Sequence, residues 1–174
     1  MMNESVGSGS AMSQAPSEPC TSTEGPGEER DESWICVGSA RSFGARTTLS
    51  IHNRIVLLLR ENSKWHCLDA ICYHAGGPLS QAAVERVDNR VCLRCPWHSY
   101  LIDIEDGHGL YMDLSRRYRS KGARQRVHKV RQDGGQLFVQ LCARAESVAS
   151  DEYAFGAQLP PQVLRQRVQR YVPR

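Results

Sequence analysis

Two short motifs constrain this chain more than any other feature of its sequence. Cys72-Tyr73-His74 and Cys95-Pro96-Trp97-His98 each place one thiol close to one imidazole. The first motif continues into Gly76-Gly77-Pro78. Glycine permits close approach of the backbone to a ligand, and proline stiffens a loop. We therefore expect two loops that carry metal ligands and that neighbouring strands hold at a fixed separation.

Two cysteines and two histidines suit two kinds of metal site. A [2Fe–2S] cluster takes this set when two His replace two Cys on one of its two irons. Zinc also takes two Cys and two His, but its usual spacing pairs Cys with Cys and His with His. Each motif here mixes the two residue types. The mixed motifs favour the cluster and leave zinc, or no metal at all, as alternatives.

The motifs resemble the two cluster-binding loops of Rieske ferredoxin domains. The resemblance covers about residues 33–156 and extends to the small Rieske domain proteins of animals. It rests on Cys72–Leu79, Cys95–His98, Gly109–Tyr111, Ser120–Gly122, Gln125–His128 and Asp151–Ala154.

The resemblance implies a Rieske-type [2Fe–2S] cofactor. Cys72 and Cys95 would hold its buried iron. His74 and His98 would hold the outer iron, with their rings near the surface, so that electrons enter and leave past the imidazoles. Two thiolates leave the oxidised centre near neutral, and the potential is therefore expected between about −150 and +300 mV, above that of all-Cys ferredoxins.

Two departures from high-potential Rieske proteins lower the reduction potential that we expect. Those proteins carry an extra Cys in each loop, which form a disulfide, and this chain has Gly77 and Trp97 there. Their Ser and Tyr that donate to sulfur are replaced by Tyr100 and Ile102. Because fewer hydrogen bonds to sulfur lower the potential, we predict a value below about +200 mV.

Short apolar runs separated by turn residues predict an all-β domain. The expected fold is a Rieske-type antiparallel sandwich or barrel with the cluster-binding loops as a subdomain. His52-Asn53 and Gln132–Gly135 predict hairpin turns. The polar segment Leu79–Asn89 is expected to be a surface excursion. We expect strands at residues 34–37, 47–51, 54–59, 64–68, 91–94, 100–104, 125–130 and 136–141.

The domain at 33–144 is expected to lie between two different flanking segments. Residues 1–32 have almost no large apolar side chain and a net charge of −6, which predicts a disordered acidic tail. Residues 145–174 form a C-terminal extension. A short helix is expected there at Pro161–Val172, where Leu164, Val168 and Tyr171 recur at helical spacing.

The sequence also limits location and cysteine chemistry. No apolar run approaches the roughly 18 residues of a membrane span, and the first residues lack the order of a secretory signal or transit peptide. A cytoplasmic protein without a membrane span is expected by default. Seven cysteines, an odd number, argue against a disulfide framework. Cys92 and Cys95 also form a C-x-x-C motif, but Cys95 is better explained as a metal ligand together with the other Cys and His residues of the two motifs.

Charge is distributed unevenly along the chain. From residue 33 onward there are 21 basic and 12 acidic residues, a net charge of +9. Many of the basic residues fall in one run, at residues 116–131. A run of this kind is typical of a solvated face, and it also suits docking of an acidic redox partner. Binding of nucleic acid is disfavoured because aromatic residues, which stack on bases, are sparse in this run. The acidic tail is a candidate to fold over this run. Its basic residues are Arg116, Arg117, Arg119, Lys121, Arg124, Arg126, Lys129 and Arg131.

The expected function is that of a one-electron carrier between a reductase and an acceptor protein. Its potential should fall with pH, because the imidazole ligands take up protons more readily once the centre is reduced. One alternative is a cluster-bearing redox or iron sensor, or a structural module. Another is a Rieske oxygenase component, which needs a second iron site with two His and one carboxylate. Without a G-x-G-x-x-G stretch, catalytic turnover is expected in a partner. The remaining histidines are His52, His66, His108 and His128.

Overall fold

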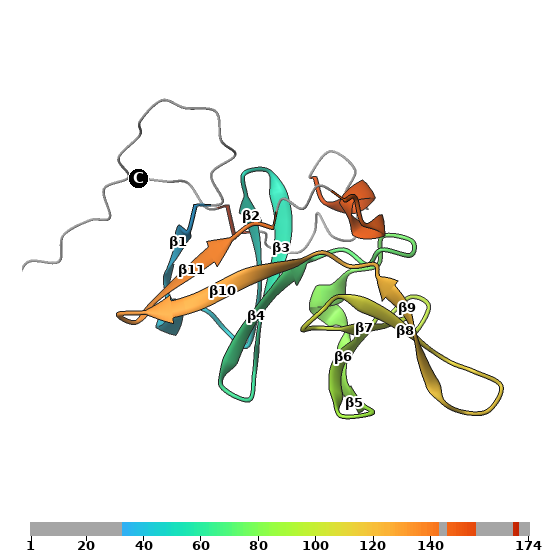
Figure 1. Ribbon diagram of the computed structural model, residues 1–174. Helices are drawn as coiled ribbons and strands as arrows, with labels where there is room; N and C mark the ends of the chain where they lie inside the picture. Colours follow the sequence, from blue (N-terminus) through green and yellow to red (C-terminus); the bar gives the residue numbers. More distant parts are fainter. Residues whose placement is uncertain (1–32, 143–145, 156–168, 171–174) are drawn as a thin grey trace, which may run out of the picture.

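The computed structural model describes residues 33–142, 146–155 and 169–170, and these form two β-sheets with three short 3-10 helices (Figure 1). The larger sheet has the order β1-β11-β10-β4-β3-β2-β12, and the smaller one β5-β6-β7-β8-β9. All strand pairs are antiparallel except β12 with β2. The all-β prediction is therefore confirmed.

The strands are β1 (Ile35–Ser39), β2 (Arg46–Ile51), β3 (Arg54–Glu61), β4 (Lys64–Asp69), β5 (Ala83–Val87), β6 (Arg90–Arg94), β7 (Leu101–Asp103), β8 (His108–Met112), β9 (Tyr118–Ala123), β10 (Val127–Asp133), β11 (Gln136–Gln140) and β12 (Gln169–Arg170). The 3-10 helices are η1 (Ala40–Ser42), η2 (Leu79–Gln81) and η3 (Ala149–Tyr153).

Strand β3 separates two hydrophobic cores. Successive side chains of a strand point to opposite faces. Ile55, Leu57 and Leu59 enter the core between the two sheets. Val56 and Leu58 enter a second core inside the larger sheet. Burial on both faces explains why this strand is an unbroken apolar run.

Tight turns fix the register of the larger sheet. His52 and Asn53 have φ values of 46° and 63°, and two positive values in succession are typical of a type I′ hairpin turn. The turn joins β2 to β3 in an antiparallel pair. Strands β10 and β11 pair in the same way across Gly134 and Gly135. Both hairpins predicted from the sequence are confirmed.

Two expectations need correction. Leu79–Asn89 is not a surface excursion, because Leu79 and Ala82 are buried in the core and β5 pairs with β6. The helix predicted at Pro161–Val172 lies outside the described residues except for Gln169–Arg170, and these two form a strand beside β2. The predicted acidic tail also lies outside the described residues. None of the helices described here has the length and apolar character to span a membrane.

Candidate metal centre

The two motifs form two loops at one end of the core between the sheets. The first loop, residues 71–78, follows β4, and the second, residues 95–100, joins β6 to β7. Cys72 N–H donates to Gly77 O at 2.8 Å, and Gly76 N–H donates back to Cys72 O at 3.0 Å. Cys95 N–H bonds to Tyr100 O at 2.8 Å. Each loop therefore closes on its own cysteine.

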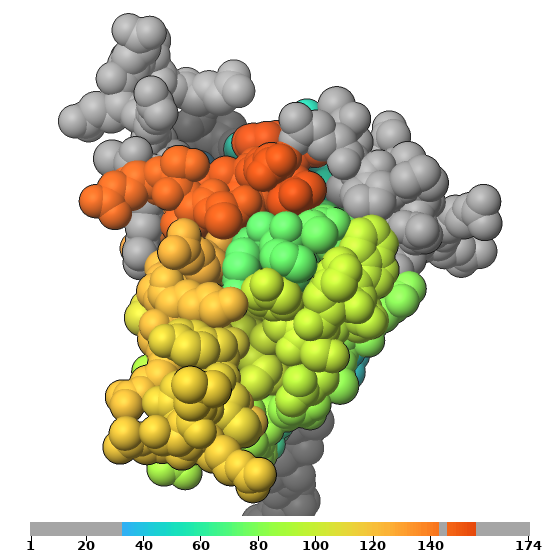
Figure 2. Space-filling view, turned by 90° about the vertical axis from the view of Figure 1, so that its right-hand side faces the viewer, coloured from blue at the N-terminus to red at the C-terminus, as the bar shows by residue number. Residues whose placement is uncertain are grey.

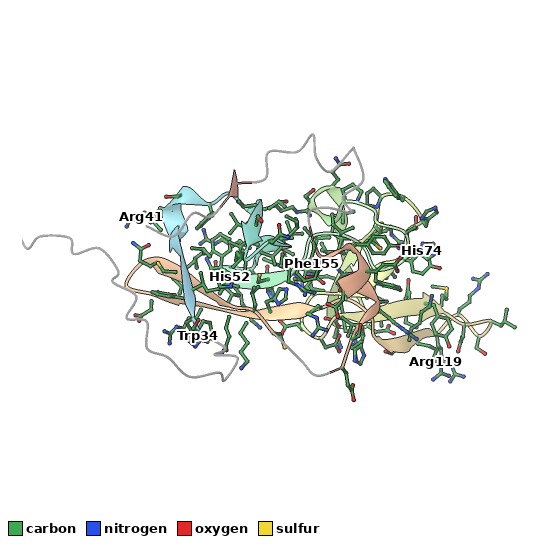
Figure 3. All side chains as sticks on the ribbon, turned by 90° about the horizontal axis from the view of Figure 1, so that it is seen from above. Trp34, Arg41, His52, His74, Arg119 and Phe155 are labelled. Atoms are coloured by element: carbon green, nitrogen blue, oxygen red, sulfur yellow. The ribbon has the colours of Figure 1, made fainter. Side chains whose placement is uncertain are left out.

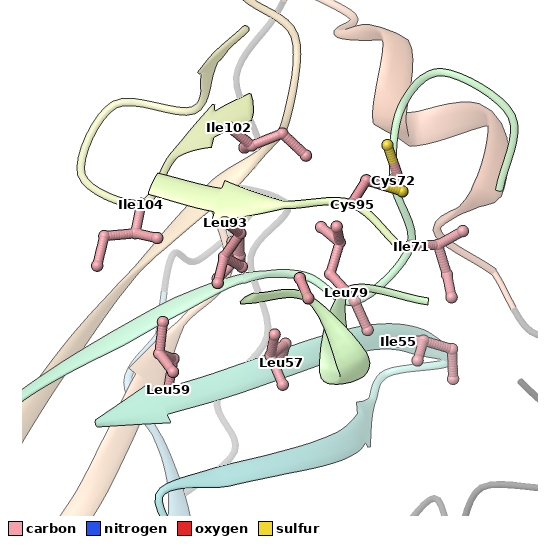
Figure 4. Packing of buried hydrophobic residues seen from close by; sticks show 13 residues of the cluster. Ile55, Leu57, Leu59, Ile71, Cys72, Leu79, Leu93, Cys95, Ile102 and Ile104 are labelled. Carbon is pink, nitrogen blue, oxygen red and sulfur yellow. The ribbon is translucent and has the colours of Figure 1, made fainter. Parts of the chain in front are cut away.

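The candidate ligands divide into a buried pair and an exposed pair. Cys72 and Cys95 belong to the core and are 1% and 2% exposed. Figure 4 shows their sulfur atoms next to each other at the edge of that core. His74 and His98 are exposed. Their ring centroids lie 4.9 Å apart, with the ring planes at 86°.

Backbone amides surround the two sulfur atoms. The hydrogen bond from the Cys72 thiol, with the N–H groups of Trp97 and His98, lowers the pKa of Cys95 to about 6. The hydrogen bond between the two thiols, together with burial, raises the pKa of Cys72. The N–H groups of His74 and Ala75 also face its sulfur and act in the opposite direction. Thiolate is the form that binds metal. A cation at this position would therefore relieve the repulsion between two adjacent thiolates.

A glycine leaves space beside the sulfur pair. A Cβ atom at Gly77 would lie 2.6 Å from Cys95 Sγ and 3.3 Å from Trp97 Cγ. Any side chain here would displace the second loop. The residues present fit a cofactor that needs the two loops to approach this closely.

Gln125 connects the first loop to the rest of the domain. Its side chain is buried, and its Oε1 accepts from Tyr73 N–H at 3.0 Å. Its Nε2 donates to Asp69 O at 2.9 Å and to Ile71 O at 2.7 Å. In the sequence, Gln125 stands out only as part of the Gln125–His128 segment that carries the resemblance, and no role is assigned to its side chain there.

An aromatic and cationic column covers the histidine side of the centre. The His74 ring stacks on Tyr100 with centroids 4.0 Å apart. Lys121 Nζ lies 4.5 Å from the centre of the Tyr100 ring. Trp97 meets His98 edge to face at 6.4 Å. The second loop thus supplies a ring beside each imidazole, and Lys121 of β9 lies over the ring that stacks on His74.

Buried charges support the chain just ahead of the first loop. Asp69 binds Arg54 Nε at 2.7 Å and His128 Nε2 at 3.2 Å, and it accepts from the Ser150 hydroxyl. Burial alone would raise the pKa of Asp69, but the hydrogen bonds from His128 and Arg54 bring it below its usual value. Burial lowers the pKa of His128, against the opposing effect of Asp69.

Asp151 joins the C-terminal segment 146–155 to the same group of charges. Its carboxylate pairs with both Arg54 and Arg126. Burial opposes ionisation, but these two partners bring the pKa of Asp151 well below its usual value. Arg126, part of the basic run, is therefore buried in an ion pair and does not belong to an exposed face.

No group of three His, Cys, Asp or Glu side chains within residues 33–142, 146–155 and 169–170 gathers where it could hold a single metal ion. The two motifs instead bring their donors together in pairs, sulfur with sulfur and ring with ring. A tetrahedral zinc site places four donors on one ion. A binuclear [2Fe–2S] centre with two Cys on one iron and two His on the other needs paired donors.

Cys92 and Cys95 do not act as a pair. Cys92 packs in a third core with Val87, Leu101 and Leu110, whereas Cys95 faces the core between the sheets. Burial raises the pKa of Cys92 to about 11. The two residues of the C-x-x-C motif therefore point into different clusters.

Comparison with known proteins agrees with this geometry. Residues 35–144 match the family of soluble Rieske-type ferredoxins. A Rieske domain-containing protein of Homo sapiens is 36% identical over 138 residues, which cover 74% of this chain and 88% of the human protein. The oxygenase component of a Rhodococcus rhodochrous 3-ketosteroid-9-alpha-monooxygenase is 33% identical over 70 residues, 38% of this chain and 17% of that protein.

Solved structures share the fold at lower identity. NdmB of Pseudomonas putida CBB5 has a TM-score of 0.53 at 19% identity, over 63% of this chain and 35% of NdmB. A Mycobacterium tuberculosis protein described as the small subunit of an NADH-dependent nitrite reductase has a TM-score of 0.52 at 16% identity, over 64% of this chain and 97% of that protein. A chain of an oxygenase and ferredoxin complex of carbazole 1,9a-dioxygenase has a TM-score of 0.50 at 22% identity, over 68% of this chain and 31% of that one.

The assignment to a family depends on two sequence matches, one to the family model and one to the human protein. The similarity to solved structures supports the fold alone. The chain belongs to the family of soluble Rieske-type ferredoxins, whose domain binds a [2Fe–2S] cluster.

Proposed function

We propose that this protein is a one-electron carrier whose cluster is held by the two loops. Cys72 and Cys95 are the ligands of the buried iron. His74 and His98 are the ligands of the outer iron. The observation that supports this assignment is the division of the donors into a buried sulfur pair and an exposed ring pair.

The chain provides an open side and a closed side to this centre. When bound, a Rieske-type cluster accepts and releases one electron at a time. Ile71, Leu79 and Ile102 close the cysteine side, because all three are buried in the same core as the sulfur atoms. The imidazoles of His74 and His98 are exposed. Exchange therefore takes place on the histidine side.

The partner on that side is a redox protein, either a reductase or an acceptor. Two observations support this part of the proposal. One structural relative is described as a complex of an oxygenase with a ferredoxin. In addition, the part of this chain from residue 33 onward carries a net charge of +9, which favours encounter with an acidic surface. The cytoplasmic location stays a prediction.

Electron paramagnetic resonance of the dithionite-reduced protein tests the assignment. The wild type should give a Rieske signal with two irons and two sulfides per chain. Cys72→Ser and His98→Ala should lose it. Cys36→Ser and His52→Asn are matched controls, because Cys36 lies on β1 and His52 in the β2–β3 turn, and both should keep the signal. Zinc in place of iron, or a signal that survives both ligand variants, contradicts the proposal.

The reduction potential separates imidazole ligation from other ligand sets. It should fall by about 59 mV per pH unit for each proton coupled to the electron. The potential is followed by voltammetry between about pH 6 and 10. A potential that does not change over this range would argue against imidazole ligation. Rapid electron exchange with a flavoprotein reductase separates a carrier from a sensor.

A further inference from the structure

A groove runs from His98 along the smaller sheet. Its volume is about 330 Å³. Tyr100, Leu110, Met112 and Tyr118 give it an apolar and aromatic lining. Lys121 also borders it, as does Arg94, whose guanidinium pairs with Glu85. The groove therefore combines an apolar floor with the Lys121 ammonium beside an exposed candidate ligand.

Exposed apolar side chains gather at the same end of the molecule. Among the described residues there are five exposed large hydrophobic side chains. Tyr111, Met112 and Leu114 lie on β8 or directly after it, and Trp97 lies in the second loop. The fifth, Phe155, packs below the Arg54 guanidinium at 5.5 Å. A gathered apolar patch of this kind marks an interaction surface.

The β8–β9 hairpin adds positive charge to this patch. Figure 2 faces this end and shows the yellow hairpin beside the green and lime-green segments of the two loops. Arg119 is neutralised by Asp113 at 2.9 Å. Lys121 Nζ lies over Tyr100 and also 5.7 Å from the centre of the Tyr111 ring. Lys121 is thus the basic group placed between the groove and the imidazoles.

The rest of the basic run lies elsewhere. Arg126 is buried against Asp151. Arg131 packs on Trp34 at 4.6 Å, and Figure 3 shows Trp34 and His74 at opposite ends of the molecule. The sixteen-residue run therefore does not form a single basic face. Near the candidate ligands the run contributes the hairpin and Arg124, which directly follows β9 and lies near Tyr73.

We propose that the groove and the β8–β9 hairpin form the docking face for a redox partner protein that presents an apolar side chain flanked by carboxylates. The apolar side chain enters the groove over Leu110 and Tyr118. A neighbouring carboxylate pairs with Lys121, over the ring that stacks on His74. This inference rests on the proposed electron-carrier function and names the chemistry of its partner. An acidic protein without an apolar anchor would leave the groove unused.

Short peptides test recognition directly. The probes are Asp-Glu-Trp-Asp-Glu, the same peptide with Ser in place of Trp, and its uncharged counterpart Asn-Gln-Trp-Asn-Gln. Each is titrated into the oxidised ¹⁵N-labelled holoprotein. The first should shift the amides of Leu110, Met112 and Tyr118 and bind at least fivefold more tightly than either other peptide. Equal affinity for the three peptides, or shifts that avoid these amides, would overturn the proposal.

Charge reversal supplies the matched variants. Lys121→Glu should weaken the Asp-Glu-Trp-Asp-Glu complex at least fivefold. Arg41→Glu makes the same charge change at the far end of the molecule (Figure 3) and should leave the affinity within twofold of wild type. Equal losses in the two variants would mean that net charge alone attracts the peptide, and the docking face would be wrong.

A separate readout distinguishes this proposal from the proposed function. Hexaammineruthenium(III), a small cation, should oxidise the reduced wild type and both variants, and it should react faster, not slower, with Lys121→Glu. If the wild type shows no Rieske signal and no such oxidation, the electron-carrier proposal fails. If signal and oxidation are intact and the peptide results are negative, only the docking face fails.

Discussion

Gln125 Oε1 accepts a hydrogen bond at 3.0 Å from the backbone N–H of Tyr73, the residue between the two candidate ligands of the first loop. The same side chain holds the carbonyls of Asp69 and Ile71. A single amide thus satisfies three backbone groups that lie on both sides of Cys72. The position of that cysteine therefore depends on Gln125.

Gln125→Met tests this dependence. Methionine has a similar volume but leaves one buried N–H and two carbonyls without their partner, and each such group costs about 1–3 kcal/mol. We expect the free energy of unfolding to fall by about 3 kcal/mol and the cluster to be lost faster in air. Urea unfolding and the decay of visible absorbance measure the two effects. Gln132→Met, at an exposed position of β10, should change neither.

Gly77→Ala should disturb the centre itself. The new Cβ would lie 2.6 Å from Cys95 Sγ, so the second loop must move, at a cost of about 1–3 kcal/mol. We expect most of the bound iron to be lost while the far-UV circular dichroism spectrum stays close to wild type. Gly44→Ala is the control, because its Cβ would meet only Arg46 O at 3.8 Å. Normal iron content in Gly77→Ala would show that the two loops do not need this contact.

Local patterns explain which parts of the fold could be predicted. The hairpin at His52-Asn53 follows from residues that tolerate positive φ. The apolar run of β3 is a strand because both of its faces are buried. The two motifs single out Cys72, His74, Cys95 and His98 as candidate ligands, and the structure places them as two pairs. Their role as ligands stays a prediction.

Long-range packing explains what could not be predicted. Leu79 lies in a polar segment, yet it fills the core because η2 folds back below the first loop. Strand β9 is polar on both faces, since it is the exposed edge of the smaller sheet. Arg126 and Arg131 each lie two residues from an exposed basic side chain. Arg126 nevertheless pairs with Asp151, and Arg131 packs on Trp34 and on Phe138, its partner across the β10–β11 hairpin.

Removal of the Tyr73 hydroxyl should not destabilise the protein, in contrast to the Gln125→Met substitution. The hydroxyl is buried, and it has no hydrogen-bond partner among the residues that the structure describes. Burial raises the pKa of Tyr73 to about 12. Because an unpaired buried hydroxyl costs free energy, Tyr73→Phe should leave stability unchanged or raise it by about 1 kcal/mol. Urea unfolding measures this change, and a loss of 2 kcal/mol or more, on the order of a lost buried bond, would mean that the hydroxyl has a partner.

A double variant locates that hydroxyl. A Cβ at Gly109 would lie 2.5 Å from Tyr73 Oη and 3.1 Å from Cζ. Gly109→Ala alone should therefore destabilise the protein, and adding Tyr73→Phe should recover part of the loss. Residues in contact give interaction energies of about 0.5–3 kcal/mol in such a cycle. Strict additivity of the two substitutions would show that the ring does not rest against β8.

Acid stability should depend on buried groups that lie outside the two loops. The pKa values of Asp69 and Asp151 lie below their usual range. Their contribution to stability is present above about pH 4, the unfolded value, and is lost as the pH falls toward the folded one. Burial also lowers the pKa of His128 and of His66. Unfolded histidine takes up a proton below about pH 6.5 while the folded one stays neutral, so stability already declines from there.

The difference in the free energy of unfolding between wild type and His128→Gln measures the contribution of the proton on His128. Unfolding also releases the cluster, but that contribution is common to both proteins and cancels in the difference. Between about pH 6.5 and 5 the wild type should lose stability more steeply than the variant, by up to about 1.4 kcal/mol per pH unit for one proton. His66→Gln should reduce the slope in the same direction, because burial also lowers the pKa of His66. Urea midpoints at several pH values give the slopes, and parallel curves for wild type and His128→Gln would mean that His128 already carries its proton in the folded protein.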